Sequence, residues 1–371
     1  MAEKFCRWGV LGTATIARKF WQSVRHAENA KLVAVASRSL DKAQSFIDEC
    51  DSRFSVQEKP VACGSYAELL SMPDLDAVYI PLPTGLRAEW VKAAARQGKH
   101  VLCEKPCAVS TAQLDEMVQA CETAGVQFMD NVMFMHGQRL DRLKKIVQDS
   151  DRFGDVRRIS SQFSFRAPAE FFGENIRADS SLEPWGCLGD LGWYNIRIAL
   201  WAMDEELPTE VVGRFHQQRP GSGPPVEMSG EMYFRENVSA SLYCSFVTEN
   251  QQWVHLSGTN GSVSLDDFSL PWFGARTAIK YNRPQFNLSG YDFNYENREV
   301  VEHVDEYSNA HVTAQEVCLV RNFSNVVLSG KRQPFWPESS SRTQAVMDAL
   351  MESALNGGIP VSVEGRENLA I

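Results

Sequence analysis

A lysine stands where a short apolar run ends, in the segment VLCEKPCAV (101–109). The run is typical of a buried strand, and Pro106 ends it because proline cannot donate a hydrogen bond to a sheet. Glu104 and Lys105 therefore fall at the edge of a predicted sheet. The ammonium group of Lys105 would extend several ångströms beyond this edge, either toward a bound molecule or as an ordinary surface charge. The residues alone leave both interpretations open.

A second candidate site follows the first predicted strand, in GVLGTATIA (9–17). Residues 12–17 read G-x-A-x-x-A, a variant of the dinucleotide fingerprint with alanine in place of the second glycine. The fingerprint places backbone N–H groups and a helix N-terminus against a pyrophosphate. A plain strand–helix turn is the alternative. The predicted contacts are Gly12, Thr13, Ala14, Thr15 and Ile16.

The end of the second strand bears on the choice of nucleotide. NAD-preferring sites place an acidic residue there to bind the ribose 2′-hydroxyl. In this chain the run KLVAVAS ends in Ser37, Arg38 and Ser39, and Lys42 follows one turn later. Hydroxyl and cationic groups favour a 2′-phosphate. The sequence therefore predicts NADP(H) over NAD(H), unless Arg38 and Lys42 are solvated surface charges.

These residues depend on a regular framework. Up to about residue 125, short apolar runs alternate with helical patterns, which indicates a parallel sheet with helices on both faces. Beyond about residue 150, alternating β-type runs indicate an antiparallel sheet. The fold class is therefore α/β, with a Rossmann domain (1–125) and an α+β domain (126–371) with a large, mostly antiparallel open sheet. Helices are predicted over 15–27, 40–51, 85–98, 110–125, 188–203, 311–330 and 340–357, and the last two could pack back on the first domain.

Composition excludes several classes of function. The net charge of −10 argues against a nucleic-acid or anionic-membrane binder. No apolar run approaches the roughly 20 residues of a spanning helix. The nine cysteines are scattered without a CxxC pair, so neither a metal site nor a disulfide framework is indicated. With no targeting segment at the start of the sequence, we expect a cytoplasmic protein.

Several motifs together carry a family resemblance: GVLGTATIA (9–17), VASRSLDKA (35–43), YIPLPT (79–84), HVLCEKP (100–106), NIRADSSLEPWGCLGDLGWY (175–194) and MESALNGGIPVSV (351–363). Spanning almost the whole chain, they resemble the Gfo/Idh/MocA family, named for glucose–fructose oxidoreductase and inositol dehydrogenase. The pattern is most similar to dimeric dihydrodiol dehydrogenase, to NADP-dependent sugar dehydrogenases and to uncharacterised plant and algal members.

The resemblance implies roles for three residues. The lysine of the family's EKP motif, here Lys105, lies beside the nicotinamide and would hold negative charge on the substrate oxygen. The family's D-x-x-x-Y pair, here Asp190 and Tyr194, faces the substrate from one side of a helix. Tyr194 would transfer the hydroxyl proton, and Asp190 would orient a hydroxyl group or the lysine. We expect the nearby ammonium to lower the phenol pKa of Tyr194.

Other positions extend the two sites. The proline-rich turn after the third strand would form a wall against the cofactor, and Trp185 in EPWG (183–186) would cap the nicotinamide or narrow the substrate site. Arg177 could contact a substrate or a phosphate, whereas His136 is better read as a core or pocket-rim residue. Arg87 replaces a histidine that is common in the family. The predicted cofactor site is completed by Pro81, Leu82, Thr84, Glu104, Lys105 and Asn131, and the predicted substrate site comprises Lys105, Arg177, Trp185, Asp190 and Tyr194.

The sequence thus predicts an NADP(H)-dependent oxidoreductase for a secondary alcohol or carbonyl of a sugar, polyol or cyclic diol. A cofactor-binding regulator without turnover is one alternative, and a glycoside-cleaving enzyme with tightly held cofactor is another. We also predict a homodimer or higher oligomer formed through the second-domain sheet. The reason is the run SASLYCSFV (239–247), which we interpret as apolar on both faces.

Overall fold

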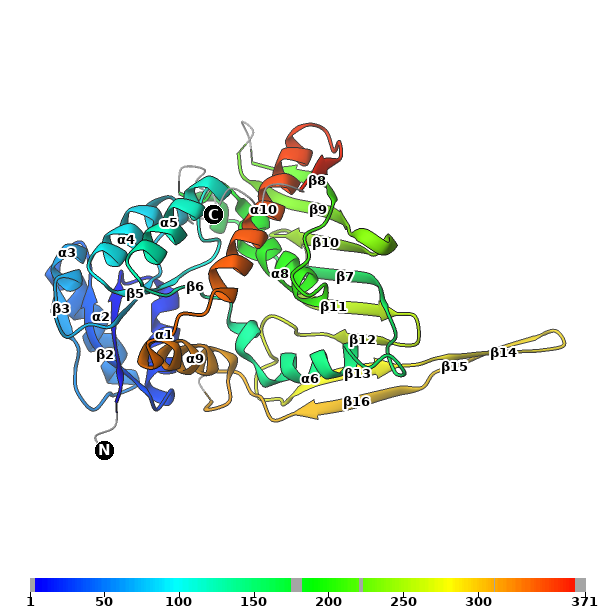
Figure 1. The fold of residues 1–371 in the computed structure, drawn as a ribbon, viewed down its shortest axis with the longest axis horizontal. Helices are drawn as coiled ribbons and strands as arrows, with labels where there is room; N and C mark the ends of the chain where they lie inside the picture. The colour runs from blue at the N-terminus through cyan, green and yellow to red at the C-terminus, as the bar shows by residue number, and fades with distance from the viewer. Residues whose placement is uncertain (1–3, 175–181, 220–222, 310, 364–371) are drawn as a thin grey trace.

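The computed structural model describes residues 4–174, 182–219, 223–309 and 311–363. A six-stranded parallel sheet forms its first part (Figure 1). The order reverses between β1 and β4, which is where doubly wound proteins bind their ligands. The strands, in spatial order, are β3 (Val61–Cys63), β2 (Ala30–Ala36), β1 (Cys6–Leu11), β4 (Ala77–Ile80), β5 (His100–Cys103) and β6 (Phe128–Asp130). The helices are α1 (Thr15–His26), α2 (Leu40–Arg53), α3 (Tyr66–Leu70), α4 (Thr84–Arg96) and α5 (Thr111–Thr123).

Local chemistry explains why these elements begin and end where they do. The last three of the four residues of β5, Val101, Leu102 and Cys103, are apolar and fully buried, as a parallel strand covered on both faces requires. Ser110 caps α5, because its hydroxyl accepts a hydrogen bond from the backbone N–H of Gln113 at 3.2 Å. The doubly wound sheet predicted from the sequence is confirmed. The first sheet also continues to Asp130, a few residues past the expected domain boundary at 125.

A nine-stranded mixed sheet forms the second part. Only β7 and β10 pair in parallel among its described strands, so the predicted, mostly antiparallel sheet is confirmed. Its order is β16 (Glu299–Val304), β13 (Thr277–Asn282), β12 (Ser262–Leu265), β11 (Gln251–Gly258), β7 (Val156–Ser164), β10 (Ser239–Ser245), β9 (Pro225–Tyr233), β8 (Glu210–Gln218) and β17 (Val361–Ser362). A separate two-stranded hairpin, β14 (Gln285–Ser289) and β15 (Asp292–Glu296), connects β13 to β16.

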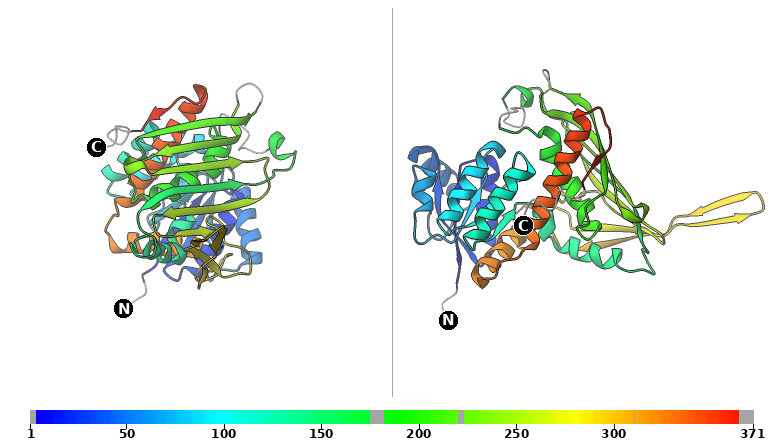
Figure 2. Two further views of the ribbon diagram at one scale, coloured as in Figure 1. Left: turned by 90° about the vertical axis from the view of Figure 1, so that its right-hand side faces the viewer. Right: turned by 45° about the horizontal axis from the view of Figure 1, so that its top comes forward.

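The described helices cover one face of this sheet. Figure 2 shows α8 and α10 between the nine strands and the first part, whereas none of the described helices lies against the opposite face. The helices of this part are α6 (Gln138–Val147), α8 (Trp193–Ala202), α9 (Gln315–Ser329) and α10 (Phe335–Leu355), with short turns at η1 (Met133–His136), α7 (Phe171–Glu174), η3 (Leu188–Gly192) and η4 (Arg235–Asn237). None of the helices in the described ranges is both long and apolar enough to cross a membrane.

The uncovered face is not the apolar surface expected from SASLYCSFV. In β10, Ala240, Leu242 and Cys244 are buried on the covered face, while Ser239, Ser241 and Tyr243 alternate onto the open one. The interpretation of two apolar faces was therefore wrong, because the strand follows a simple period of two.

The C-terminal helices connect the two parts. Helix α9 packs against α1 and β1, and the indole of the buried Trp8 donates a hydrogen bond to Ser324 at 3.0 Å. Helix α10 contacts α5 and β6 on one side and α8 and β8 on the other. The chain thus returns from the second sheet to complete the helical cover of the first.

A fully buried ion pair lies at the junction of the two parts. The Arg197 guanidinium, on α8, lies 2.7 Å from the carboxylate of Asp130, at the end of β6, and neither side chain has any exposed surface. The Trp193 indole also donates to Asp130 at 3.2 Å, and Arg197 donates to Thr343 at 2.8 Å. Removing one charge would leave the other buried and uncompensated.

We therefore expect Arg197→Met to lower the free energy of unfolding by about 3 kcal/mol in urea titrations. Arg18→Met is the matched control, because the Arg18–Glu49 pair is about one third exposed on each side and its loss should lower the free energy of unfolding much less than loss of the buried pair. Equal losses in the two variants would contradict this reading of the buried pair.

Candidate active site

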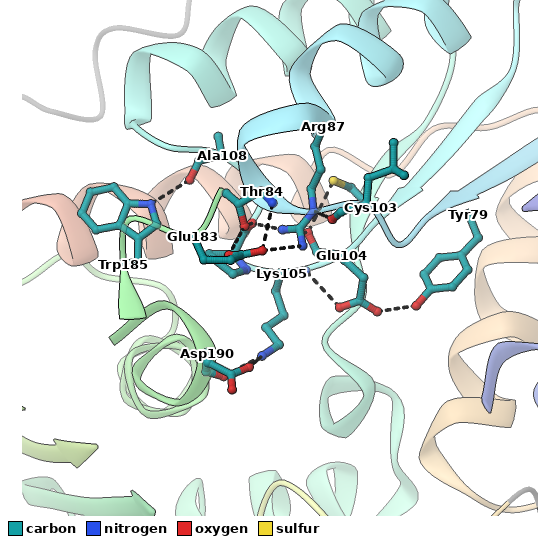
Figure 3. Close-up of polar contacts among 12 residues, drawn as sticks. Tyr79, Thr84, Arg87, Cys103, Glu104, Lys105, Ala108, Glu183, Trp185 and Asp190 are labelled. Atoms are coloured by element: carbon teal, nitrogen blue, oxygen red, sulfur yellow. Dashed lines mark hydrogen bonds and ion pairs between the residues drawn. The ribbon is translucent and has the colours of Figure 1, made fainter. Parts of the chain in front are cut away.

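Lys105 joins the two parts of the protein through its ammonium group (Figure 3). It follows β5 directly, and its Nζ donates to the backbone oxygen of Asp190 at 2.5 Å and to Asp190 Oδ1 at 2.9 Å. The side chains of Lys105 and Asp190 are 9% and 16% exposed. Because Asp190 lies in the turn η3 of the second part, the contact forms where the two parts face each other. The lysine is therefore not an ordinary surface charge.

Tyr194 lies one turn beyond Asp190, in the first turn of α8. Its ring centroid is 4.6 Å from the Lys105 Nζ, and Phe134 and Phe163 pack around the ring at centroid distances of 6.2 and 5.5 Å. The structure thus brings together Lys105, Asp190 and Tyr194, which the sequence proposed as a group.

The expected shift in the Tyr194 pKa is wrong in direction. Burial raises the phenol pKa above its ordinary value, the ammonium of Lys105 opposes this shift, and the carboxylates of Glu104 and Asp190 add to it. Desolvation outweighs the attraction of one cation that is itself paired with a carboxylate. The phenol therefore remains protonated at neutral pH.

Glu104 belongs to a separate buried cluster. Its Oε1 accepts hydrogen bonds from the Tyr79 hydroxyl and, at 2.5 Å, from the Asn131 amide, and its Oε2 accepts from the backbone N–H of Lys105 at 3.2 Å. Glu104 therefore fixes the backbone from which the lysine extends. The sequence did not predict Tyr79 as a site residue. A signal was present, because a tyrosine in an apolar run is expected to be buried and a buried hydroxyl requires a hydrogen-bond partner.

Arg87 holds the loop that carries Lys105. From α4, its guanidinium donates to the carbonyl oxygens of Leu82 at 2.6 Å, Glu104 at 3.0 Å and Pro106. The Lys105–Pro106 peptide bond is cis. Arg87 is only 4% exposed, so it stabilises the backbone of this loop from the protein interior. The sequence marked Arg87 as a departure from the family but gave no role for it.

Residues of the segment EPWG connect the second part to the first. The Glu183 carboxylate accepts from the backbone N–H of Thr84 at 3.0 Å and from its hydroxyl at 2.6 Å. The Trp185 indole donates to the carbonyl oxygen of Ala108 at 3.0 Å and is 8% exposed. The structure thus places Thr84 and Trp185 in buried contacts between the two parts.

The turn after β1 fits a dinucleotide phosphate. Gly12 has φ of +116°, and a Cβ atom there would lie 3.0 Å from a methyl of Leu82, so only glycine suits the position. Ala14 begins α1 in an extended conformation with no side-chain cap. The first N–H groups of α1 are therefore available to an anion. Thr13 and Ile16 are half-buried and Thr15 is exposed.

The end of β2 lies beside this turn, since the Gly12 N–H donates to the Ala36 oxygen at 2.9 Å. Arg38 and Lys42 are exposed, and Arg38 has no ion-pair partner among the described residues. The Ser39 hydroxyl caps α2 by accepting from the Lys42 N–H, and Ser37 is buried. Pro81 and Leu82 are buried in the turn after β4.

Two further candidates have different outcomes. Arg177 lies outside the described residues. His136 is buried, its ring stacks on Trp336 at 4.4 Å, and its Nδ1 pairs with the Asn322 amide at 3.2 Å. Burial lowers the pKa of His136 to about 3, which fits the core interpretation. The described residues contain no group of three or more side chains suited to a metal ion.

Comparisons with known proteins agree with this architecture. Residues 6–132 match the Gfo/Idh/MocA family model described as an oxidoreductase family with an NAD-binding Rossmann fold, and residues 140–264 match the family's C-terminal domain. D-xylose 1-dehydrogenase (NADP(+)) 2 of Haloferax volcanii is 34% identical over 262 residues, which cover 70% of this chain and 75% of that protein. Trans-1,2-dihydrobenzene-1,2-diol dehydrogenase of Bos taurus is 28% identical, covering 78% of this chain and 83% of that protein.

A solved structure shows the same arrangement over nearly the whole chain. KijD10, a 3-ketoreductase from Actinomadura kijaniata in complex with NADP and TDP-benzene, is 26% identical, with a TM-score of 0.76. The match covers 95% of this chain and 98% of KijD10. The predicted family, with its sugar and dihydrodiol dehydrogenase relatives, is therefore confirmed: the chain belongs to the Gfo/Idh/MocA family of NAD(P)-dependent oxidoreductases.

Proposed function

We propose that the protein is an NADP(H)-dependent oxidoreductase acting on a secondary alcohol or carbonyl of a sugar, polyol or cyclic diol. The observation that carries the proposal is the contact of the Lys105 ammonium with Asp190, above the ring of Tyr194. These three groups lie together at the carboxyl edge of the first sheet, where a dinucleotide binds in this fold. When bound there, the nicotinamide supplies or accepts a hydride.

The three side chains divide the remaining chemistry. Lys105 donates to the substrate oxygen and stabilises the negative charge that develops on it. Tyr194 gives a proton to that oxygen in the reduction direction and removes it during oxidation. Asp190 holds the ammonium in place and can accept a hydrogen bond from a neighbouring substrate hydroxyl. The raised pKa of Tyr194 keeps the phenol protonated, which favours proton donation to a carbonyl at neutral pH.

A substrate screen tests this proposal. Sugars, polyols and cyclic diols are offered with NADP⁺, and the matching carbonyl compounds with NADPH. We expect at least one compound class to give a net, enzyme-dependent change in nicotinamide absorbance. A complete absence of turnover, with nucleotide binding intact, would favour the regulator instead.

The choice of NADP(H) rests on Arg38. Its guanidinium is exposed at the end of β2, beside the Gly12 turn, and carries no ion pair within the described ranges. The xylose dehydrogenase relative is named for NADP(+), and KijD10 was solved with NADP. A guanidinium can bind a 2′-phosphate with two parallel hydrogen bonds.

We therefore expect Arg38→Ala to raise the Kd for NADPH at least tenfold and to leave the Kd for NADH within about twofold, by fluorescence titration. Arg53→Ala is the control, because Arg53 is an exposed cation at the other end of α2. Equal losses for the two nucleotides would show that Arg38 does not contact the 2′-phosphate.

We further propose a cytoplasmic protein that assembles as a homodimer or higher oligomer through the second sheet. All nine cysteines are free and buried, which suits a reducing compartment and therefore the proposed location in the cytoplasm.

The uncovered face of the nine-stranded sheet supports the proposed assembly, because it leaves a broad surface for a second copy (Figure 2). Light scattering that shows a monomer at micromolar concentration would contradict it.

A further inference from the structure

The hairpin of β14 and β15, which we call the arm, extends far from the rest of the protein (Figure 1). It connects the strands β13 and β16 at one edge of the nine-stranded sheet. Its own strands pair only with each other. An isolated two-stranded hairpin is at best marginally stable in water, so an arm of this kind needs a surface to pack against.

The two faces of the arm differ completely in chemistry. Cross-strand partners on one face are Phe286 with Tyr295 and Leu288 with Phe293. The partners on the other face are all polar: Gln285 with Glu296, Asn287 with Asn294, and Ser289 with Asp292. A strand pair with this alternation is built to bury one face and to expose the other to water.

Nothing in the described part of the chain covers the apolar face. The exposed fractions are 52% for Phe286, 61% for Leu288, 74% for Phe293 and 73% for Tyr295. At the tip, Gly290 has φ of +61°, which the first of the two central residues of a type II′ turn requires. The second central residue, Tyr291, is 98% exposed. Exposed apolar clusters of this size mark interaction sites.

The arm and the uncovered sheet face lie on the same side of the molecule. The left view in Figure 2 looks onto the nine strands without an intervening helix, and the arm comes toward the viewer. The open face contains a hollow of about 270 Å³, which is lined mainly by polar residues of β7, β8, β9 and β10 and also by Val212, Tyr243 and Trp253. An arm pointing away from its own sheet cannot cover that face, but the arm of a second copy can.

We propose that the apolar face of the arm packs on the uncovered sheet face of a second copy of this chain, so that two copies clasp each other. The proposal rests on the assembly suggested above and is independent of the catalytic roles. Two-fold symmetry makes the contact reciprocal and closes the assembly.

The area involved fits a stable dimer. With 150–250 Å² for a whole aromatic side chain, the exposed parts of the three rings and Leu288 offer roughly 500 Å² per arm. Two arms and the surfaces that they cover would then remove about 2,000 Å² from water, at the upper end of the range for specific interfaces.

The test compares two triple variants of the same arm by sedimentation velocity over a concentration series. Phe286→Ser, Phe293→Ser and Tyr295→Ser remove the apolar face, and the matched control changes the polar face with Gln285→Ser, Asn287→Ser and Asn294→Ser. We expect a wild-type dimer or larger assembly, at least a tenfold higher Kd for the apolar-face variant, and no change for the control. A monomeric wild type, or equal Kd values for wild type and the apolar-face variant, would overturn the proposal.

A crosslinking experiment locates the contact. All native cysteines are buried, so Tyr291→Cys provides a single accessible thiol for a photoreactive maleimide. With a mixture of tagged and untagged copies, we expect crosslinks between copies that map to β7, β8, β9, β10 or β11. Crosslinks confined to the same copy, or to other surfaces of the second copy, would overturn it. Turnover is not a readout in either experiment, so failure here is distinct from failure of the catalytic proposal.

Discussion

Replacing Lys105 with methionine is expected to lower kcat by about a thousandfold while the Kd for the nucleotide changes little. The substitution keeps the length of the side chain and removes the charge that stabilises the developing oxyanion, an effect of about 10²–10³. The loss should also exceed that of a single donor, because the substitution removes both hydrogen bonds between the ammonium and Asp190 and leaves the Asp190 carboxylate without this cation. Steady-state turnover at saturating concentrations of the best substrate of the screen measures the effect.

The control for this variant is Lys92→Met. Lys92 lies on α4 and its ammonium pairs with Glu116 at 2.9 Å on the surface, so its loss should leave kcat within about twofold. Thermal unfolding of both variants separates catalysis from stability. If Lys105→Met retains full turnover, the ammonium has no part in the chemistry.

Tyr194→Phe is expected to lower kcat by about a hundredfold or more in both directions, the usual contribution of a positioned proton donor. The wild-type pH profile should reveal the same group. Burial raises the Tyr194 pKa, so the phenolate needed for oxidation is a minor species at neutral pH. Wild-type oxidation should therefore accelerate about tenfold per pH unit between pH 7 and 9, while reduction, which uses the neutral phenol, stays nearly constant.

The phenylalanine variant should lose this slope as well as the rate. Phe134 and Phe163 already surround the ring, so phenylalanine fits the same space and the fold should be retained. A variant that keeps the pH dependence of the wild type would assign the titration to another group.

Much of the fold could be predicted because periodicity and end residues report local structure directly. The alternation of buried strands and helices up to β5 identified the doubly wound sheet, and Ser110 marked the start of α5. The site group was found through motifs, since Asp190 and Tyr194 lie 85 or more residues from Lys105 and no local pattern joins them. Their roles, and the remaining site residues, are still predictions.

The errors came from quantities that depend on three-dimensional packing. The Tyr194 pKa depends on how much water the folded site excludes, and the sequence showed only the neighbouring cation. Glu183 accepts a hydrogen bond from the Thr84 hydroxyl, 99 residues away in the sequence, and Arg87 donates to the carbonyl oxygen of Pro106 in the Lys105 loop, so these partners were not visible in the sequence. The arm was missed for a different reason: QFNLSGYDFNYE alternates plainly, but only the structure shows that its apolar face has no cover within the described chain.

The most direct test of the central claim follows a hydride. NADPH carrying deuterium at the transferable C4 position is incubated with the enzyme and the best carbonyl substrate, and the product is analysed by mass spectrometry and NMR. The proposed function predicts deuterium on the carbon of the new alcohol, with loss of the signal in Lys105→Met. Alcohol formed without deuterium, or cleavage of an aryl glycoside with no net change in the nicotinamide, would contradict it.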